Sequence, residues 1–138
     1  MKPVTIAVTL LLVCISFPIS LGAAKVEVEG KAWLDAQKDP PAINVNGSWD
    51  VEDWGTLHLI QSEGSRDVSG NGGGYDLVGV VSGKKLFLLF AEKHTVEYCA
   101  TLSSDGENSL AGSYSNRKSR VHSGLCQEST RPMYMKKK

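Results

Sequence analysis

The sequence predicts an all-β fold, a small antiparallel meander barrel of about seven to eight strands with a short N-terminal helix after a signal peptide. Three features favour this fold. From Ile43 onward, clusters of Gly, Asn, Asp and Ser recur at the spacing of hairpin turns. The segments between these clusters are rich in Val, Leu, Tyr and Phe, which suit strands. A short pattern that ends in glycine recurs along them and favours a closed sheet.

The first residues have the pattern of a signal peptide. Lys2 precedes an apolar stretch that ends in small residues up to Ala24. The strongest part of this stretch, Ile6–Phe17, is shorter than the roughly 20 apolar residues that span a bilayer. A lipid anchor on Cys14 is disfavoured, because Val13 is bulky where a lipobox has a small residue. We therefore expect residues 1–24 to be removed and the mature chain to be secreted or periplasmic.

A lead segment at 25–46 is expected to precede the barrel domain at 47–138, which ends in a basic C-terminal tail. Lys25–Gly30 alternates valine with glutamate and indicates a short extended segment. Lys31–Lys38 is predicted to form one or two helical turns, which end at Asp39-Pro40-Pro41 because proline cannot continue a helix.

The clearest strand is Thr95–Leu102, where alternate residues are apolar. Its apolar face is predicted to consist of Val96, Tyr98, Ala100 and Leu102. Further strands are expected at Ser48–Asp50, Gly55–Gln61, Asp67–Gly70, Tyr75–Val81, Lys84–Glu92, Ser109–Asn116 and Pro132–Lys136. The strongest turn signals are Ser82-Gly83 and Asp105-Gly106, and Ser69–Gly74 is interpreted as a flexible hairpin loop.

An apolar residue, a spacer and a glycine recur at Val68–Gly70, Leu77–Gly79 and Leu110–Gly112. Each repeat places a glycine on the apolar face, where the missing side chain lets a strand coil tightly around a small interior. Lys84–Glu92 is apolar on both faces, so its outer face needs a cover. The predicted helix, with Trp33, is the plainer cover; a subunit or partner interface is the alternative.

Cys99 and Cys126 are the cysteines that remain after export, and we expect them to form a disulfide. Such a bridge stabilises a fold by roughly 3 kcal/mol in the chain-entropy account. With His94 and His122, the same cysteines also have zinc-ligand spacing. An oxidising compartment favours the disulfide over metal thiolates, so no metal or other cofactor is expected.

The sequence has only weak signals of a catalytic site. Asp50, Glu52 and Asp53 lie beside Trp49 and Trp54, a combination that glycoside hydrolases use, but acidic residues near an exposed turn are usually only solvated. The serines and histidines lack the context of a nucleophile elbow. We therefore predict no catalytic residues, and a hydrolase ranks third among the functions considered.

Basic residues dominate the end of the chain, Arg117–Lys138, where Glu128 is the one acidic residue. This segment suits peripheral contact with an anionic envelope surface, and a solubilising tail is the alternative. Nucleic-acid binding is not expected, because the chain is exported and Tyr134 is the one aromatic residue in the segment.

Gly47-Ser48-Trp49, followed by Gly55 and the three repeats that end in glycine, resembles the calycin barrels, that is lipocalins and avidins. The layout is more similar to the avidin arrangement and covers Gly47–Tyr114. The resemblance implies a small molecule in the barrel mouth, Trp49 at one barrel end and a late basic residue, Arg131, stacked on it. It does not imply biotin, because Asp50–Asp53 replaces the polar residues with which avidins bind that ligand.

We therefore predict a non-catalytic exported barrel that binds an unidentified small molecule or protein partner. The candidate contact residues are Trp49, Trp54, Tyr98 and Tyr114, for which ordinary core packing is the alternative. The second hypothesis is an envelope-associated structural or inhibitory protein that acts through its outer face or loops. A deep cavity favours the first hypothesis; a filled interior with an exposed apolar patch at Phe87 and Leu89 favours the second.

Overall fold

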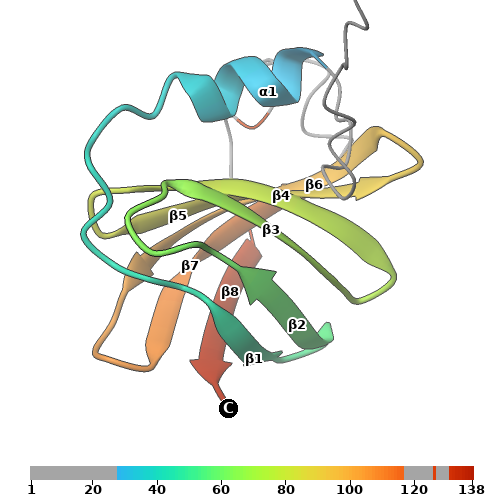
Figure 1. The fold of residues 1–138 in the computed structure, drawn as a ribbon. Helices are drawn as coiled ribbons and strands as arrows, with labels where there is room; N and C mark the ends of the chain where they lie inside the picture. Colours follow the sequence, from blue (N-terminus) through green and yellow to red (C-terminus); the bar gives the residue numbers. More distant parts are fainter. Residues whose placement is uncertain (1–27, 117–125, 127–130) are drawn as a thin grey trace, which may run out of the picture.

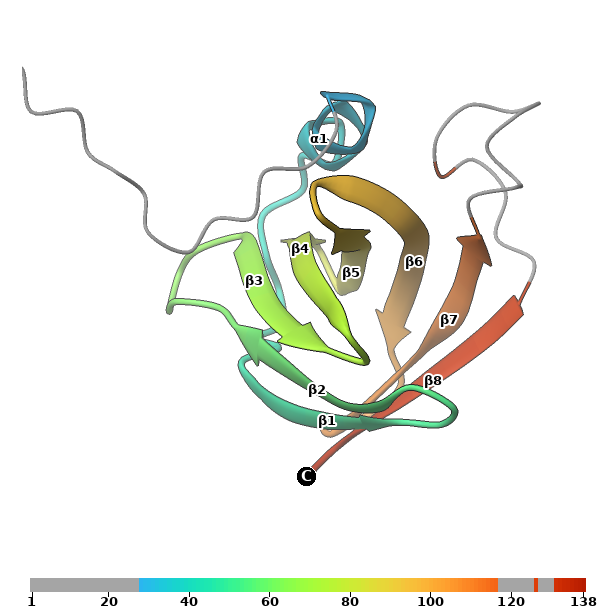
Figure 2. The same cartoon turned by 90° about the vertical axis from the view of Figure 1, so that its right-hand side faces the viewer.

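The protein forms a closed antiparallel barrel, which confirms the predicted fold class (Figures 1 and 2). The computed structural model describes residues 28–116, 126 and 131–138. Each strand pairs with its neighbours along the chain, and the last strand pairs with the first. The strands are β1 Gly47–Val51, β2 Gly55–Ile60, β3 Asp67–Gly72, β4 Tyr75–Ser82, β5 Lys85–Glu92, β6 Thr95–Ser104, β7 Ser109–Asn116 and β8 Arg131–Lys137.

Every predicted strand is present, and each end lies within two residues of its prediction. The expected loop at Ser69–Gly74 is wrong in part, because β3 continues to Gly72 and pairs there with β2 and β4. Only Gly73 and Gly74 form the turn, with φ of 61° and 86°. A two-residue hairpin needs just two residues with positive φ, so the glycines before them remain in the strand.

The three repeated glycines face the interior, as predicted, because each pairs with residues whose side chains are buried inside the barrel. Gly70 lies opposite Leu59 on one side and Leu77 on the other. A Cβ atom added at Gly70 would overlap the backbone oxygen of His58, and one added at Gly112 would overlap that of Thr101. The strands therefore approach one another too closely for any side chain at these positions.

The predicted inner face of β6 is wrong at one residue. Phe90 pairs with Tyr98 but Ala91 pairs with Val96, so Glu97 forms a β-bulge. A bulge adds one residue to a strand and reverses the alternation beyond it. Val96 therefore packs outside the barrel in the cluster beneath the helix, whereas Tyr98 packs inside.

Helix α1, Val28–Asp35, lies over the outer face of β4, β5 and β6 (Figure 1). It begins and ends three residues before the predicted helix, so Val28–Gly30 is helical and not extended, and the helix already ends at Asp35, before the two prolines. Trp33 and Leu34 pack on the outer apolar face, and the rings of Trp33 and Phe87 are 5.5 Å apart. This packing covers Leu89 completely, which explains why β5 is apolar on both faces.

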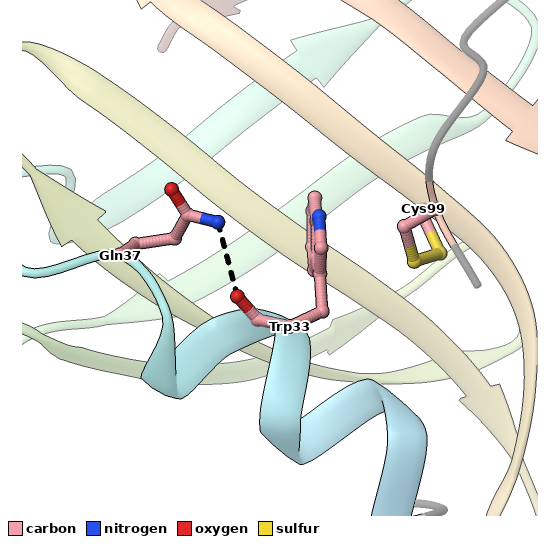
Figure 3. The surroundings of a disulfide bond; sticks show 4 residues. Trp33, Gln37 and Cys99 are labelled. Carbon is pink, nitrogen blue, oxygen red and sulfur yellow. Dashed lines mark hydrogen bonds between the residues drawn. A yellow bond between two sulfur atoms is a disulfide. The ribbon is translucent and has the colours of Figure 1, made fainter. Parts of the chain in front are cut away.

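Cys99 on β6 forms the predicted disulfide with Cys126, and their Cα atoms are 5.4 Å apart. The disulfide belongs to the same outer cluster as Leu34 and Val96. Figure 3 shows Trp33 of α1 pointing toward the strands beside this bridge, with its backbone oxygen accepting a hydrogen bond from Gln37. A disulfide is consistent with an oxidising, exported environment.

Two sequence predictions concern segments outside the described residues. The signal peptide with Cys14 is one, and the basic segment that begins at Arg117 is the other, although its last part, from Arg131, forms β8. Within the residues that the structure describes, no helix is both long and apolar enough to cross a membrane.

Candidate functional site: the two ends of the barrel

The barrel has two differently built ends. We call the end at Ile43, Val45, Trp49 and Gln61 the lead end, because the segment between α1 and β1 closes it. Backbone hydrogen bonds with Gly83 hold this segment against the turn between β4 and β5. Val45 and Trp49 are buried in the interior cluster there, at 1% and 3% exposure.

Gln61 connects the groups at the lead end and is itself buried. Its side-chain oxygen accepts a hydrogen bond from the Val45 N–H at 2.7 Å, and its amide nitrogen donates to the Ser65 carbonyl at 2.8 Å. The Trp49 indole N–H donates to the Val45 carbonyl at 2.9 Å. Buried polar groups are costly unless they are paired, so these bonds keep the lead segment in place.

The basic residue above Trp49 is not the one that the calycin resemblance implied. Arg131 pairs with Tyr114 at the start of β8, which is the opposite end of the barrel from Trp49. Lys137 pairs with Trp49 across the β1–β8 seam, and its Nζ atom is 5.9 Å from the centre of the indole ring. Because β8 runs antiparallel to β1, its last residues and not its first lie beside Trp49.

At the other end, which we call the aromatic end, five rings gather: Trp54, Tyr75, Phe90, Tyr98 and Tyr114. Trp54 is central, with ring centres 4.7 to 5.9 Å from those of the other four. Phe90 is fully buried, whereas the other four rings are partly buried against the core. The tyrosines therefore pack on the interior while part of their surface still faces solvent.

Local turn geometry carries Trp54 to this position. The Trp54 N–H donates a hydrogen bond to the Val51 carbonyl at 3.0 Å, which folds the chain back after β1. Asp53 has φ of 68°, and Asp tolerates this left-handed conformation better than most residues. The tight turn places the indole at the barrel end where Tyr75 begins β4 and where Tyr98 lies in the first half of β6.

Tyr75 is partly buried beside Tyr98 and lies near two carboxylates. Burial raises the pKa of its hydroxyl, and the interaction and hydrogen bond with Tyr98 raise it further. The carboxylates of Glu92 and Glu97 add to the effect, because they disfavour a second negative charge nearby. The Tyr75 hydroxyl is therefore a neutral hydrogen-bonding group close to these two carboxylates.

A surface depression of about 420 Å³ adjoins this ring, between the β3–β4 and β5–β6 hairpins. Its walls include Asn71, Tyr75, Asp76, Glu92 and Lys93. A smaller hollow of about 160 Å³ lies at the lead end, beside Trp49 and Leu110. The barrel interior between the two ends is filled by packed side chains that are at most 1% exposed, among them Leu57, Leu77, Leu86, Leu88 and Leu102.

The sequence-predicted contact residues thus divide between the two ends. Trp54, Tyr98 and Tyr114 come together at the aromatic end, whereas Trp49 lies at the lead end in the core. The sequence analysis missed Tyr75 and Phe90, which join the same cluster. Their place follows only from strand register, because Phe90 lies opposite Tyr98 and Tyr75 begins the strand beside it.

The other chemical arrangements that the sequence suggested are not assembled in the described residues. Asp50 lies on β1 and forms an ion pair with Lys138 at 3.3 Å, and the two tryptophans beside the acidic cluster lie at opposite barrel ends. In the described part of the chain, no three histidine, cysteine or acidic side chains are grouped to hold a metal ion. The disulfide also removes the two cysteine ligands of the zinc alternative.

Protein-family models, curated proteins and solved structures were all compared with this chain, and none matched. The arrangement of its own side chains is therefore the basis for any functional assignment.

Proposed function

We propose that the protein is an exported, non-catalytic binding protein that contacts its ligand with the aromatic end of the barrel. The observation that carries this proposal is the group of partly exposed rings around Trp54, next to a depression of about 420 Å³. Aromatic rings give large contact areas at small entropic cost, and tyrosine adds a hydroxyl that can hydrogen-bond a ligand. Such rings are over-represented at binding surfaces for this reason.

The barrel end suits a ligand better than the barrel interior does. The interior is occupied by fully buried leucine side chains, so a ligand there would have to displace a packed core. The apolar outer face at Phe87 and Leu89 is also occupied, because α1 covers it. The aromatic end offers apolar and polar groups that solvent already reaches.

Export is part of this proposal. The signal-peptide pattern before Ala24 supports it, and so does the disulfide between Cys99 and Cys126.

A distant relation to the calycin barrels also belongs to the proposal. It is supported by the closed meander of eight strands and by Gly47-Ser48-Trp49 at the start of β1, with Lys137 above the indole.

A ligand screen, followed by NMR titrations that report on single residues, tests the proposed site. The mature protein is screened by thermal shift against pools of small molecules and peptides, since a ligand at a hundred times its dissociation constant stabilises by roughly 2.7 kcal/mol. Each hit is then titrated into ¹⁵N-labelled protein. We expect the largest shifts at the hairpin tips 52–55, 72–76 and 91–95. Shifts concentrated at leucines of the interior, with the tips unchanged, would contradict the proposal.

A matched pair of substitutions separates binding from folding. Tyr114→Leu removes a ring of the aromatic end, and Tyr134→Leu removes a 62% exposed ring from the outer face of β8. Only Tyr114→Leu should weaken a hit from the screen. Equal affinities for the two variants would place the ligand elsewhere.

A second candidate function is peripheral contact with an anionic envelope surface. Its support is the exposed outer side of β8, where Tyr134 is followed by the exposed Lys136 on the same face and by Lys138. Co-sedimentation with vesicles that contain an anionic lipid tests it. Lys136→Glu should abolish co-sedimentation and leave the thermal midpoint unchanged; binding that is equal for neutral vesicles would refute this candidate.

A further inference from the structure

We infer that the Cys99–Cys126 disulfide acts as a latch for α1. The bridge keeps the helix docked on the barrel, and its reduction releases the helix and uncovers the apolar outer face of β4, β5 and β6. This inference goes beyond the proposed function, because it concerns the outer face and not the aromatic end. Figure 3 shows the bridge and Trp33 of the helix on the same side of the strands. Helix, strands and bridge share one buried group, the outer cluster, which consists of Leu34, Val80, Leu89, Val96, Cys99 and Cys126.

The helix depends on its docking surface for its stability. α1 has eight residues, fewer than the roughly 12 to 15 that an isolated helix needs to be even marginally stable in water. Trp33 packs against Phe87 and Leu34 is buried in the outer cluster, so this packing involves one turn near the end of the helix. At the same end, the Arg66 guanidinium donates a hydrogen bond to the Leu34 carbonyl at 3.0 Å. A loss of packing around Leu34 therefore affects the whole helix.

Cys126 joins the outer cluster from outside the sheet. It lies in the connection between β7 and β8, and the bridge to Cys99 attaches that connection covalently to β6. Its φ of 66° is left-handed, a conformation that costs free energy for a residue with a Cβ atom and that persists where the surroundings impose it. We therefore expect Cys126 to leave this conformation, and the outer cluster, when the bridge is broken.

Reduction of the bridge needs a dithiol, which gives up two electrons and two protons. The S–S bond breaks, thiols form on Cys99 and Cys126, and the dithiol is itself oxidised to a disulfide. The two cysteines are only 2% and 8% exposed, so an attacking thiolate reaches the sulfur atoms when the helix and its surroundings open. The docked helix and the closed bridge therefore protect each other, and by linkage each favours the other by the same factor.

Release of the helix uncovers side chains that are now completely buried. Leu89 and Val96 have 0% exposure beneath the helix, and Val80 has 4%. Thiols persist in a reducing compartment, so we expect α1 to stay released in a chain that has not yet been exported. Oxidation after export then closes the apolar face.

The first test measures hydrogen exchange at single amides of the mature protein before and after reduction by dithiothreitol. We expect reduction to speed exchange at residues 32–36, in the second half of α1 and just after it, by at least about tenfold. The amides of β1, β2 and β8, strands that contribute no described residue to the outer cluster, should remain protected. The control is oxidised Leu102→Val, which removes one methylene from the inner face of β6. Its exchange at residues 32–36 should stay within about twofold of the native rate.

The second test uses the linkage and does not require the reduced protein to stay folded. The native protein and its variants are equilibrated in mixtures of reduced and oxidised dithiothreitol, and the thiols are counted. Leu34→Ala should shift the equilibrium toward the thiols by about fivefold, because it weakens docking of the helix. Leu102→Val should shift it by less than about twofold.

Unchanged exchange at residues 32–36 after reduction would overturn the inference, because the helix would then stay docked without the bridge. Loss of protection in β1, β2 and β8 together with α1 would also overturn it, because the bridge would then hold the whole fold and not the helix. Equal shifts for Leu34→Ala and Leu102→Val would lead to the same conclusion.

Discussion

The lead end and the aromatic end close the same barrel by different chemistry. At the lead end a segment of backbone crosses the opening, and Gln61 and Trp49 bind it through buried hydrogen bonds to Val45. At the aromatic end, as far as the described residues show, side chains fill the opening, and four of the five rings keep part of their surface in solvent. Hydrogen bonds between backbone and buried side chains hold the lead segment in one conformation. Packed aromatic rings can keep their positions and still have one side accessible to a ligand.

We propose that the lead end contributes mainly to stability and the aromatic end mainly to ligand binding. Hydrogen-bonding potential at the lead end is used within the chain, so little remains for a partner. At the aromatic end the side chains of Asp76 and Glu92 are exposed to solvent. Four substitutions or conditions test this division, and their expected effects on the free energy of unfolding differ in size.

Gln61→Ala should have the largest effect. It leaves the buried Val45 N–H and the partly buried Ser65 carbonyl without their partners, which costs about 3 kcal/mol. Urea unfolding followed by tryptophan fluorescence measures the loss. The control is Ser62→Ala, an exposed neighbour, which should change the free energy by less than about 0.5 kcal/mol. A small effect of Gln61→Ala would mean that the lead segment does not depend on this hydrogen-bonded group.

Trp54→Ala should destabilise the fold by about 2 kcal/mol, less than the loss for a fully buried tryptophan because this ring is partly exposed. It should also abolish binding of any ligand that contacts the aromatic end. Trp54→Phe keeps an aromatic ring and is expected to recover most of the stability. A loss of stability from Trp54→Ala that exceeds the loss from Gln61→Ala would reverse the assignment of stability to the lead end.

Lys137→Ala removes the cation above Trp49 and should cost about 0.5 kcal/mol, the usual size of an exposed cation–π contact. Lys136→Ala, at the preceding residue of β8, changes the net charge equally and is the control. We expect no measurable change for the control. Equal losses of stability in both variants would show that Lys137 acts only through its contribution to the net charge.

Alkaline pH should have the smallest effect, and it acts at the aromatic end. The raised pKa of Tyr75 means that the unfolded chain releases this proton more readily than the folded protein. Stability is therefore unaffected below about pH 10 and falls as the pH rises through the pKa of the folded state. Unfolding measured from about pH 8 to about pH 11 should show a steeper loss for the native protein than for Tyr75→Phe. Parallel curves would exclude the effect.

Local patterns were sufficient to predict most of the fold. Period-two alternation placed Thr95–Leu102 in a strand, and Ser82-Gly83 marked a turn that the structure has, with φ of 61° at Gly83. These signals depend on each residue and its close neighbours along the chain. Val96 is a residue for which these local signals fail. The bulge at Glu97 turns its side chain to the outer face of the barrel, and the bulge is visible only when β6 is aligned with β5.

The candidate site was predicted less completely than the fold. Aromatic residue type was enough to single out Trp54, Tyr98 and Tyr114, but the same reasoning included Trp49, which lies at the other end. Nothing in the local sequence shows that the two tryptophans lie at different barrel ends. Their positions along the strands show it, because Trp49 lies within β1 and Trp54 lies in the turn that follows β1.

By itself the sequence determined the number and approximate ends of the strands, the inward glycines and the disulfide partners, because these follow from periodicity, turn chemistry and the count of cysteines. Only the tertiary structure decided which rings meet, that Lys137 and not Arg131 lies over Trp49, and that Gln61 holds the lead segment. These facts depend on register and closure, since pairing β8 with β1 brings together residues that no local pattern relates.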